Sequence, residues 1–165
     1  MSALQDHVAM MHRAWPDNLL MRFYLAHGRD YAIGPATFAG PRGKPQQCYM
    51  NATLLALRDS TLTYVEGYVH AIIPLQHAWC VTADGVVIDP TLGDAKLGST
   101  AGTTDRISDY FGVPFRTDYL MKASTRNKRY GLLDIMSAPK TMPKLIELGL
   151  EDGQRWLLDG KRRKM

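Results

Sequence analysis

Hydrophobic side chains near the start of the chain recur at the three- and four-residue spacing of α-helices. This spacing predicts a helix over residues 3–15. Residues 16–18 (PDN) interrupt the pattern and can cap a second helix, which is expected to run from Leu19 to about Ala26. The apolar face of the first helix consists of Leu4, Val8, Met11 and Trp15.

The middle of the chain combines a loop, a buried helix and several strand-like segments. Residues 34–45 are rich in Gly and Pro and are expected to form a loop. The helix predicted over residues 48–57 is apolar on nearly every side, which is typical of a buried helix. Asp84-Gly85 is a hairpin signal between two of the strand-like segments. The strands predicted from β-branched and aromatic residues are 62–73, 77–83 and 86–89.

Beyond Pro90 the pattern is less regular. Residues 92–106 are expected to form a polar surface loop, and residues 110–115 (YFGVPF) a partly apolar turn. Residues 119–135 fit either a strand or a helix, and residues 143–158 fit a closing helix. The pattern as a whole predicts an α+β fold in one domain, residues 1–160, followed by a basic C-terminal tail, residues 161–165.

The composition narrows the classes of protein to which the chain can belong. The chain has 165 residues, of which 45% are hydrophobic and 22% charged, as in ordinary globular domains. No apolar run approaches the roughly 20 residues of a membrane span. Residues 1–15 lack the basic and then apolar layout of a signal peptide. We therefore expect a cytoplasmic protein with no membrane partner.

Positive charge is concentrated in the last quarter of the chain. Residues 1–120 carry 9 basic and 11 acidic side chains, whereas residues 121–165 carry 11 basic and 5 acidic ones. The basic tail is either a solvated end of the chain or a contact for nucleic acid or an acidic partner.

The two cysteines, Cys48 and Cys80, have neither the number of a disulfide framework nor the spacing of a zinc site. We expect free thiols, no metal and no other cofactor. Cys48 begins the predicted buried helix, where unpaired N–H groups and the helix dipole favour the nucleophilic thiolate. The same N–H groups can bind an oxyanion, and the side chains of Gln46, Gln47 and Asn51 are candidate additional donors. The alternative for Cys48 is a cysteine that only packs.

The register of the hairpin decides whether His77 and Asp89 can act together. A two-residue loop would point them to opposite faces of the sheet. A three-residue loop, residues 83–85, sets Thr82 opposite Val86 and puts glycine at the left-handed position. His77 and Asp89 then become diagonal neighbours on one face, about 7–8 Å apart at the backbone. Taken singly, each residue also fits a structural role at the end of a strand.

Strand alternation places three further residues. Trp79 shares the face of His77 and is expected to pack beside it. Glu66 either lines a substrate cleft or is a surface or paired carboxylate. Cys80 should point away from His77 and pack on the opposite face.

The segments QCYMNATLLAL, TYVEGYV and HAWCVTADGVVIDPT resemble the transglutaminase-like branch of the papain-like cysteine enzymes. The resemblance covers residues 45–92 and rests mainly on HAW followed by DPT, downstream of a helix that begins with Cys. It implies a papain-like or transglutaminase-like core, in which the Cys-bearing helix packs on an antiparallel sheet. It also implies a catalytic triad of Cys48 as nucleophile, His77 as base and Asp89 as the orienting carboxylate.

The resemblance leaves the reaction open, because the family includes peptidases, amide-hydrolysing enzymes, transglutaminases and inactive binding modules. We expect a cysteine hydrolase, either a peptidase or an amidase, that forms a thioester with a protein, peptide or amide-containing small molecule. The alternatives are a transglutaminase or other acyltransferase with the same triad, and a non-catalytic module that binds an acidic partner through the basic C-terminal region. No calcium loop of the DxDxDG type is present in the sequence.

Overall fold

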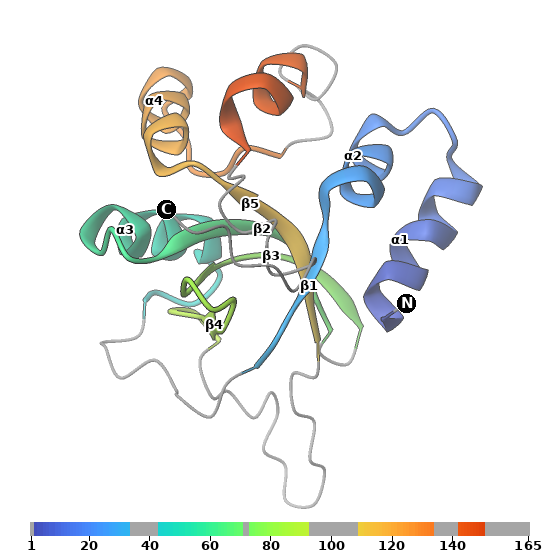
Figure 1. Ribbon diagram of the computed structural model, residues 1–165, viewed down its shortest axis with the longest axis horizontal. Coiled ribbons are helices and arrows are strands. Elements are labelled where there is room, and N and C mark those ends of the chain that lie inside the picture. The colour runs from blue at the N-terminus through green and yellow to red at the C-terminus, as the bar shows by residue number, and fades with distance from the viewer. Residues whose placement is uncertain (1, 34–42, 71–72, 93–108, 134–141, 151–165) are drawn as a thin grey trace, which may run out of the picture.

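The computed structural model describes residues 2–33, 43–70, 73–92, 109–133 and 142–150. In these ranges the chain forms an antiparallel sheet with helices packed against it (Figure 1). The helices are α1 (Ala3–Ala14), α2 (Leu19–His27), α3 (Cys48–Arg58), α4 (Thr117–Asn127) and the π-helical turn η1 (Leu145–Gly149). The strands are β1 (Arg29–Tyr31), β2 (Thr63–His70), β3 (Pro74–Val81), β4 (Val87–Ile88) and β5 (Asp109–Phe115).

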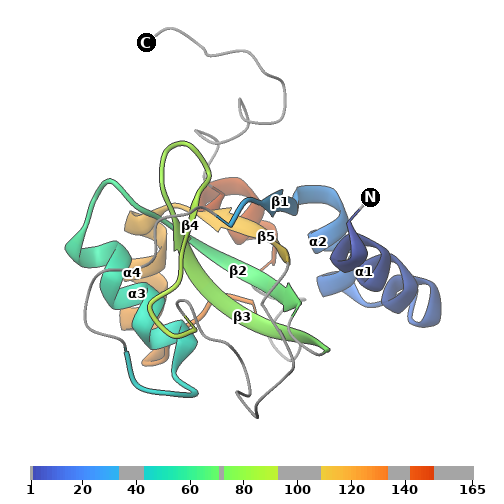
Figure 2. The same ribbon diagram turned by 90° about the horizontal axis from the view of Figure 1, so that it is seen from below.

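The sheet is curled, and its two edges touch. Its strands lie in the order β1-β5-β2-β3-β4, and every neighbouring pair is antiparallel. Ala32, just after β1, bridges to Val86, just before β4, and the Val87 N–H donates to the Ala32 carbonyl at 3.0 Å. The sheet therefore has an inner face enclosed by the curl and an outer face that the helices cover. Figure 2 shows α3 and α4 at one end of the strands and α1 and α2 at the other.

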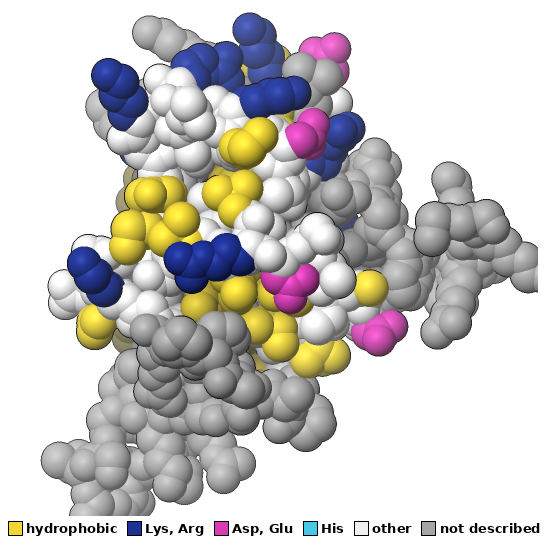
Figure 3. All heavy atoms as spheres, turned by 90° about the vertical axis from the view of Figure 1, so that its left-hand side faces the viewer, with side chains coloured by type: hydrophobic (Ala, Val, Ile, Leu, Met, Phe, Trp, Pro, Cys, Tyr) yellow, Lys and Arg dark blue, Asp and Glu magenta, His cyan; other side chains and the backbone are white. Residues whose placement is uncertain are grey.

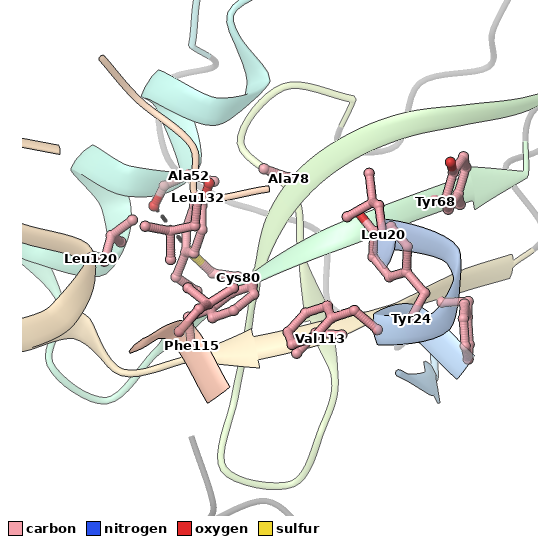
Figure 4. Packing of buried hydrophobic residues seen from close by; sticks show 14 of the residues in the cluster. Leu20, Tyr24, Ala52, Tyr68, Ala78, Cys80, Val113, Phe115, Leu120 and Leu132 are labelled. Atoms are coloured by element: carbon pink, nitrogen blue, oxygen red, sulfur yellow. Dashed lines mark hydrogen bonds between the residues drawn. The ribbon is translucent and has the colours of Figure 1, made fainter. Parts of the chain in front are cut away.

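The outer face carries the larger hydrophobic core. Helical side chains pack there against alternate residues of β2, β3 and β5 (Figure 4). This packing fixes α3 against the sheet, mainly against β3 and also against β2. The labelled members are Leu20, Tyr24, Ala52, Tyr68, Ala78, Cys80, Val113, Phe115, Leu120 and Leu132.

The inner face carries a second, smaller core that surrounds Trp79. Two paired glycines, Gly67 on β2 and Gly112 on β5, make room for it. A Cβ on Gly112 would lie 2.7 Å from the Trp79 ring, and a Cβ on Gly67 would lie 2.1 Å from a backbone oxygen of β5. The indole therefore lies over Gly112, where any side chain would displace it. The buried residues of this core are Tyr31, Val65, Val69, Trp79, Val81, Val87 and Tyr110.

The elements predicted from periodicity in the first half of the chain are confirmed to within a few residues. The Asn18 side chain caps α2 by accepting hydrogen bonds from the Leu20 and Met21 N–H groups at 3.0 and 3.3 Å. α3 and the three strands that follow it lie where the sequence places them. The sequence left residues 119–135 as either a strand or a helix, and the structure has a helix over residues 117–127. The strand β1 was not predicted, because its three residues are too few to produce a pattern.

The prediction of a turn at residues 110–115 is wrong, because they form β5 between β1 and β2. Pro114 made this segment unlike an interior strand, since proline has no N–H to donate. β1 begins at Arg29, opposite Gly112, so Pro114 lies beyond the part of β5 that β1 flanks. The described part of the predicted closing helix is helical over residues 142–149, with π-helical geometry in η1, and residues 151–158 lie outside the described ranges.

In the described ranges, none of the helices has the length and apolar character that crossing a lipid bilayer requires.

Candidate active site

The hairpin between β3 and β4 has the predicted three-residue loop. The Thr82 N–H donates to the Val86 carbonyl at 3.0 Å, and the Gly85 N–H donates to the Thr82 carbonyl at 2.9 Å. Gly85 has a φ of 78°, a left-handed value that glycine adopts without steric cost. In this register His77 and Asp89 share the inner face of the sheet.

His77 and Asp89 form a buried pair. His77 Nε2 lies 2.7 Å from Asp89 Oδ2, and the two residues are only 5% and 4% exposed. Asp89 Oδ2 also accepts from the Tyr110 hydroxyl at 2.9 Å, and Oδ1 accepts from the Thr91 and Leu92 N–H groups at 2.8 and 2.9 Å. Burial raises the pKa of Asp89, but the bond to His77 and the other donors outweigh it and hold the pKa below its ordinary value.

α3 begins at Cys48, whose thiol is free and half-buried. β4 pairs only with the last two residues of β3, so the part of β3 that carries His77 has no β4 neighbour in the described ranges. Burial lowers the pKa of His77, but hydrogen bonds to Asp89 and Cys48, with the charges of both groups, raise it to about 9. Because Nε2 is bonded to Asp89, Nδ1 is the ring nitrogen that remains for Cys48.

The backbone ahead of Cys48 leaves the first turn of α3 open. Gln47 is the N-cap residue, and its side chain makes no capping hydrogen bond. Gln46 has a φ of 62°, a left-handed value that costs a non-glycine residue about 1–3 kcal/mol. Both glutamines are exposed next to the cysteine. The backbone just before α3 is thus strained at Gln46, and no side chain caps the N–H groups at the start of the helix. N–H groups without a capping side chain are what an oxyanion site needs.

The expectation that Asn51 donates to an oxyanion requires a correction. Its amide nitrogen donates to the Lys44 carbonyl at 2.8 Å and to the Thr91 hydroxyl at 2.9 Å. An amide NH₂ has two N–H bonds, so both are already used. Asn51 instead connects α3 to the segment with Lys44 and to the segment with Thr91. These two segments also contact each other, because the Gly43 N–H donates to the Pro90 carbonyl at 2.8 Å.

Trp79 and Cys80 lie on opposite faces of β3, as strand alternation predicts. The Trp79 ring stacks on His77, with ring centroids 6.2 Å apart and planes at 14°. Cys80 is buried in the outer core, and its thiol donates to the Ala52 carbonyl at 3.3 Å (Figure 4). Burial raises the pKa of the Cys80 thiol, so this cysteine is a packing residue.

Of the two interpretations of Glu66, the structure favours the paired carboxylate, because this side chain is buried and hydrogen-bonded on the face opposite to His77. It lies on the outer face and is 1% exposed. Its Oε1 accepts from the Tyr64 hydroxyl at 2.8 Å and from the Leu132 N–H, and its Oε2 accepts from the Leu133 N–H at 2.9 Å. Burial raises the pKa of Glu66 to about 7 although these donors oppose the rise. Glu66 anchors the segment after α4 to the sheet.

Tyr110 is a site residue that the sequence analysis missed. Its pairing with Val69 in the β2–β5 ladder places it on the inner face, where its hydroxyl reaches Asp89. The signal that was available is the alternation of large apolar residues at positions 111, 113 and 115, which is typical of a strand with one face in the core.

Basic side chains gather over α4, in the upper part of the face that Figure 3 shows. They surround a surface hollow beside η1, and two of them form ion pairs with Asp118: Arg116 at 3.1 Å and Lys122 at 4.0 Å. The acidic partner expected at the basic C-terminal region stays a prediction, and residues 161–165 lie outside the described ranges. The charged residues around the hollow are Arg116, Asp118, Lys122, Arg126 and Lys144.

The fold and the site together define an α+β protein in which a helix that begins with Cys meets a buried His–Asp pair on a curled antiparallel sheet. No protein-family model matches the chain, and searches of curated proteins and of solved structures return no match. Within the described ranges, His, Cys, Asp and Glu side chains form no group of three that could hold a metal ion.

Proposed function

We propose that this chain is a cysteine hydrolase of the transglutaminase-like, papain-like kind, which acts as a peptidase or amidase. The observation that carries the proposal is the meeting of Cys48, His77 and Asp89, which come from α3, β3 and the segment after β4. Such a meeting supports acyl transfer, because a nucleophile, a base and a residue that orients the base are its requirements.

The first half of the reaction forms a thioester. His77 takes the thiol proton of Cys48, and the sulfur attacks the carbonyl carbon of an amide. The electron pair of the C=O double bond moves to the oxygen, which N–H groups at the start of α3 bind. The intermediate then collapses: the C–N bond breaks, the imidazolium gives its proton to the nitrogen, and an amine leaves.

The second half returns the enzyme to its starting state. Neutral His77 takes a proton from water, and the hydroxide oxygen attacks the thioester carbon. The C–S bond breaks, the acid leaves, and the imidazolium returns a proton to the sulfur of Cys48. Asp89 stabilises the imidazolium in both halves, and this agrees with the raised pKa of His77. An acyltransferase would differ only in using an amine in place of water.

The first test compares the two thiols of the chain. We expect iodoacetamide at about pH 6 to alkylate Cys48 at least about ten times faster than Cys80, because only a thiolate reacts readily. Peptide mass spectrometry reads each site, and Cys80→Ala is the control that should leave the fast reaction intact. Slow and equal labelling of both thiols contradicts the proposal and favours a binding module.

The second test identifies the reaction. We expect the native protein, but not the Cys48→Ala variant, to cleave members of a mixed library of fluorogenic peptide amides. A labelled primary amine added to the assay competes with water for the thioester. Incorporation of the amine in preference to hydrolysis would replace the hydrolase with an acyltransferase, and equal cleavage by Cys48→Ala would end the proposal.

A further inference from the structure

Three residues on the inner face of the sheet carry buried polar atoms without a hydrogen-bond partner in the part of the chain that the structure describes. These atoms are Nε and Nη1 of Arg29, the hydroxyl of Tyr31 and Nε1 of Trp79. The residues are 6%, 7% and 0% exposed. All four atoms can donate a hydrogen bond, and the three nitrogens can only donate. The inner face therefore presents a cluster of donors in need of acceptors.

The cluster and the candidate active site lie on one row of the sheet. Arg29 pairs with Gly112, Gly112 pairs with Gly67, and Gly67 pairs with His77. Paired residues project to the same face, so Arg29 and His77 flank the two glycines, with the Trp79 ring over Gly112. Three interstrand spacings separate the two backbones by about 14 Å along the sheet.

Aromatic rings connect the two ends of this row. The ring centroids of Tyr31 and Trp79 are 5.9 Å apart, and those of Trp79 and His77 are 6.2 Å apart. Arg29 and Tyr31 are alternate residues of β1 and project to the same face, and the charge of Arg29 opposes the rise that burial gives to the pKa of Tyr31. Arg29 and Tyr31 thus form one polar group at the far side of Trp79 from His77.

A carboxylate is the ligand group that fits this cluster. A guanidinium keeps its charge when buried, and an unpaired buried charge is strongly unfavourable. A carboxylate neutralises the charge and offers about four acceptor sites, whereas a water molecule offers two and no charge. We propose that Arg29 and Tyr31 bind a carboxylate of the substrate, so that the enzyme acts on amides with a nearby carboxylate, such as the C-terminal end of a peptide.

This inference rests on the proposed function of Cys48 and His77 and specifies the class of substrate. An extended peptide rises about 3.4 Å per residue, and the Arg29 side chain shortens the gap to the active site. The carboxylate is therefore expected about one to three residues from the amide that is cleaved.

The experiment uses three alkylating reagents: N-bromoacetyl-glycine and its diglycine and triglycine homologues. Each reagent ends in a carboxylate and is compared with the same molecule ending in a carboxamide. Mass spectrometry measures alkylation at Cys48. For at least one peptide length, we expect the reagent with the carboxylate to alkylate Cys48 of the native protein at least about ten times faster than the reagent with the carboxamide. Arg29→Met should abolish this preference and leave the rate with iodoacetamide unchanged. Arg22→Met, on the exposed side of α2, is the matched control and should keep the preference.

Equal rates for carboxylate and carboxamide at every length in the native protein would overturn the inference, as would a preference that survives in Arg29→Met. This variant removes a guanidinium that has two buried nitrogens without a hydrogen-bond partner, so it should fold with at least the native melting temperature. If it does not fold, Tyr31→Phe replaces it and should reduce the preference by removing one donor.

A binding measurement separates this inference from the proposed function. If Cys48 proves unreactive, the proposed function fails, but acetyl-diglycine should still raise the melting temperature of the native protein more than its carboxamide does. The difference should disappear in Arg29→Met. Equal shifts for the two compounds would overturn the inference independently of the chemistry of Cys48.

Discussion

The Asn51 side chain donates to the Thr91 hydroxyl at 2.9 Å and joins the first turn of α3 to the segment that follows Asp89. The same nitrogen donates to the Lys44 carbonyl at 2.8 Å, so one side chain connects three segments of the chain. The Thr91 N–H in turn donates to Asp89 Oδ1 at 2.8 Å. Asn51 therefore sets the position of the helix start relative to the carboxylate that holds His77.

Asn51→Ala should weaken both the fold and the site. It leaves the Thr91 hydroxyl without this donor and the Lys44 carbonyl with only the Gln47 N–H at 3.3 Å, so we expect a loss of about 1–3 kcal/mol in the free energy of unfolding, measured in urea. Alkylation of Cys48 by iodoacetamide at about pH 6 should slow as the thiol and His77 separate. Thr91→Val removes only one of the two bonds and should give a smaller loss. An unchanged alkylation rate in Asn51→Ala would show that the site does not depend on this connection.

Asp89→Asn should move the alkaline limb of the pH–rate profile. The bond to Asp89 and its charge help to raise the pKa of His77 to about 9. With a neutral amide in that place the imidazolium loses its proton at lower pH, so thioester formation should begin to fail well below pH 9. The rate at the optimum should fall by about 100-fold or more. Asp84→Asn, on the exposed hairpin loop, should keep the native profile.

Tyr110→Phe should give a smaller effect of the same kind. It removes one of four donors to Asp89, the hydroxyl at 2.9 Å, and leaves the bond to His77 in place. We expect a decrease of about 3- to 10-fold in kcat with little change in KM, because about 1 kcal/mol of support for the carboxylate is lost. Tyr130→Phe, at a half-exposed position, is the control. A change in KM alone would assign Tyr110 to substrate binding instead.

Glu66→Gln should flatten the dependence of stability on pH. The pKa of Glu66 is raised by burial from 4.5 to about 7, so between these values the folded protein binds more protons than the unfolded chain. Stability should therefore fall as the pH rises through this window, by up to about 3 kcal/mol. Glutamine carries no charge and should remove that decline. Urea unfolding at several pH values measures it, and Glu147→Gln, an exposed carboxylate, should retain the native curve.

Gly67→Ala should disrupt the sheet beneath the site. The added Cβ would lie 2.1 Å from the Phe111 backbone oxygen, and a backbone atom in a central ladder cannot move aside without breaking pairing. We expect a loss of about 3 kcal/mol or more in the free energy of unfolding. The atoms nearest to an added Cβ at Gly149 belong to the side chains of Tyr119 and Leu145, which can move aside, so the cost of Gly149→Ala should be smaller. Equal stabilities for the two variants would show that the backbones of β2 and β5 are not closely packed at Gly67 and Gly112.

The local elements of the candidate site were predictable because each has a signal within a few residues. The helix that begins at Cys48 follows from the apolar residues along it, although the expectation that it is buried on nearly every side is wrong, because Leu57 is 43% exposed. The hairpin loop follows from the preference of glycine for the left-handed conformation at position 85, and one loop residue determines whether His77 and Asp89 share a face.

Contacts that span the sheet had no such signal. The role of Tyr110 depends on the pairing of β5 with β2. Pro114 led to the prediction of a turn there, because proline is unusual in an interior strand. The alternation along β2 showed which residues share a face with Glu66, but it did not show that this face lies under the helices. The position of Arg29 opposite a glycine pair depends on β1, which is too short to be read from sequence.

The amino-acid sequence by itself determined the helix that begins at Cys48, the three-residue hairpin loop and the common face of His77 and Asp89. These depend on backbone preferences and on periodicities of two and 3.6 residues, which act between near neighbours. Only the tertiary structure decided which face is enclosed, which donors hold Asp89 and where Arg29 lies. Those outcomes depend on strand order and on the curl of the sheet, and these arise from packing between segments far apart in the chain.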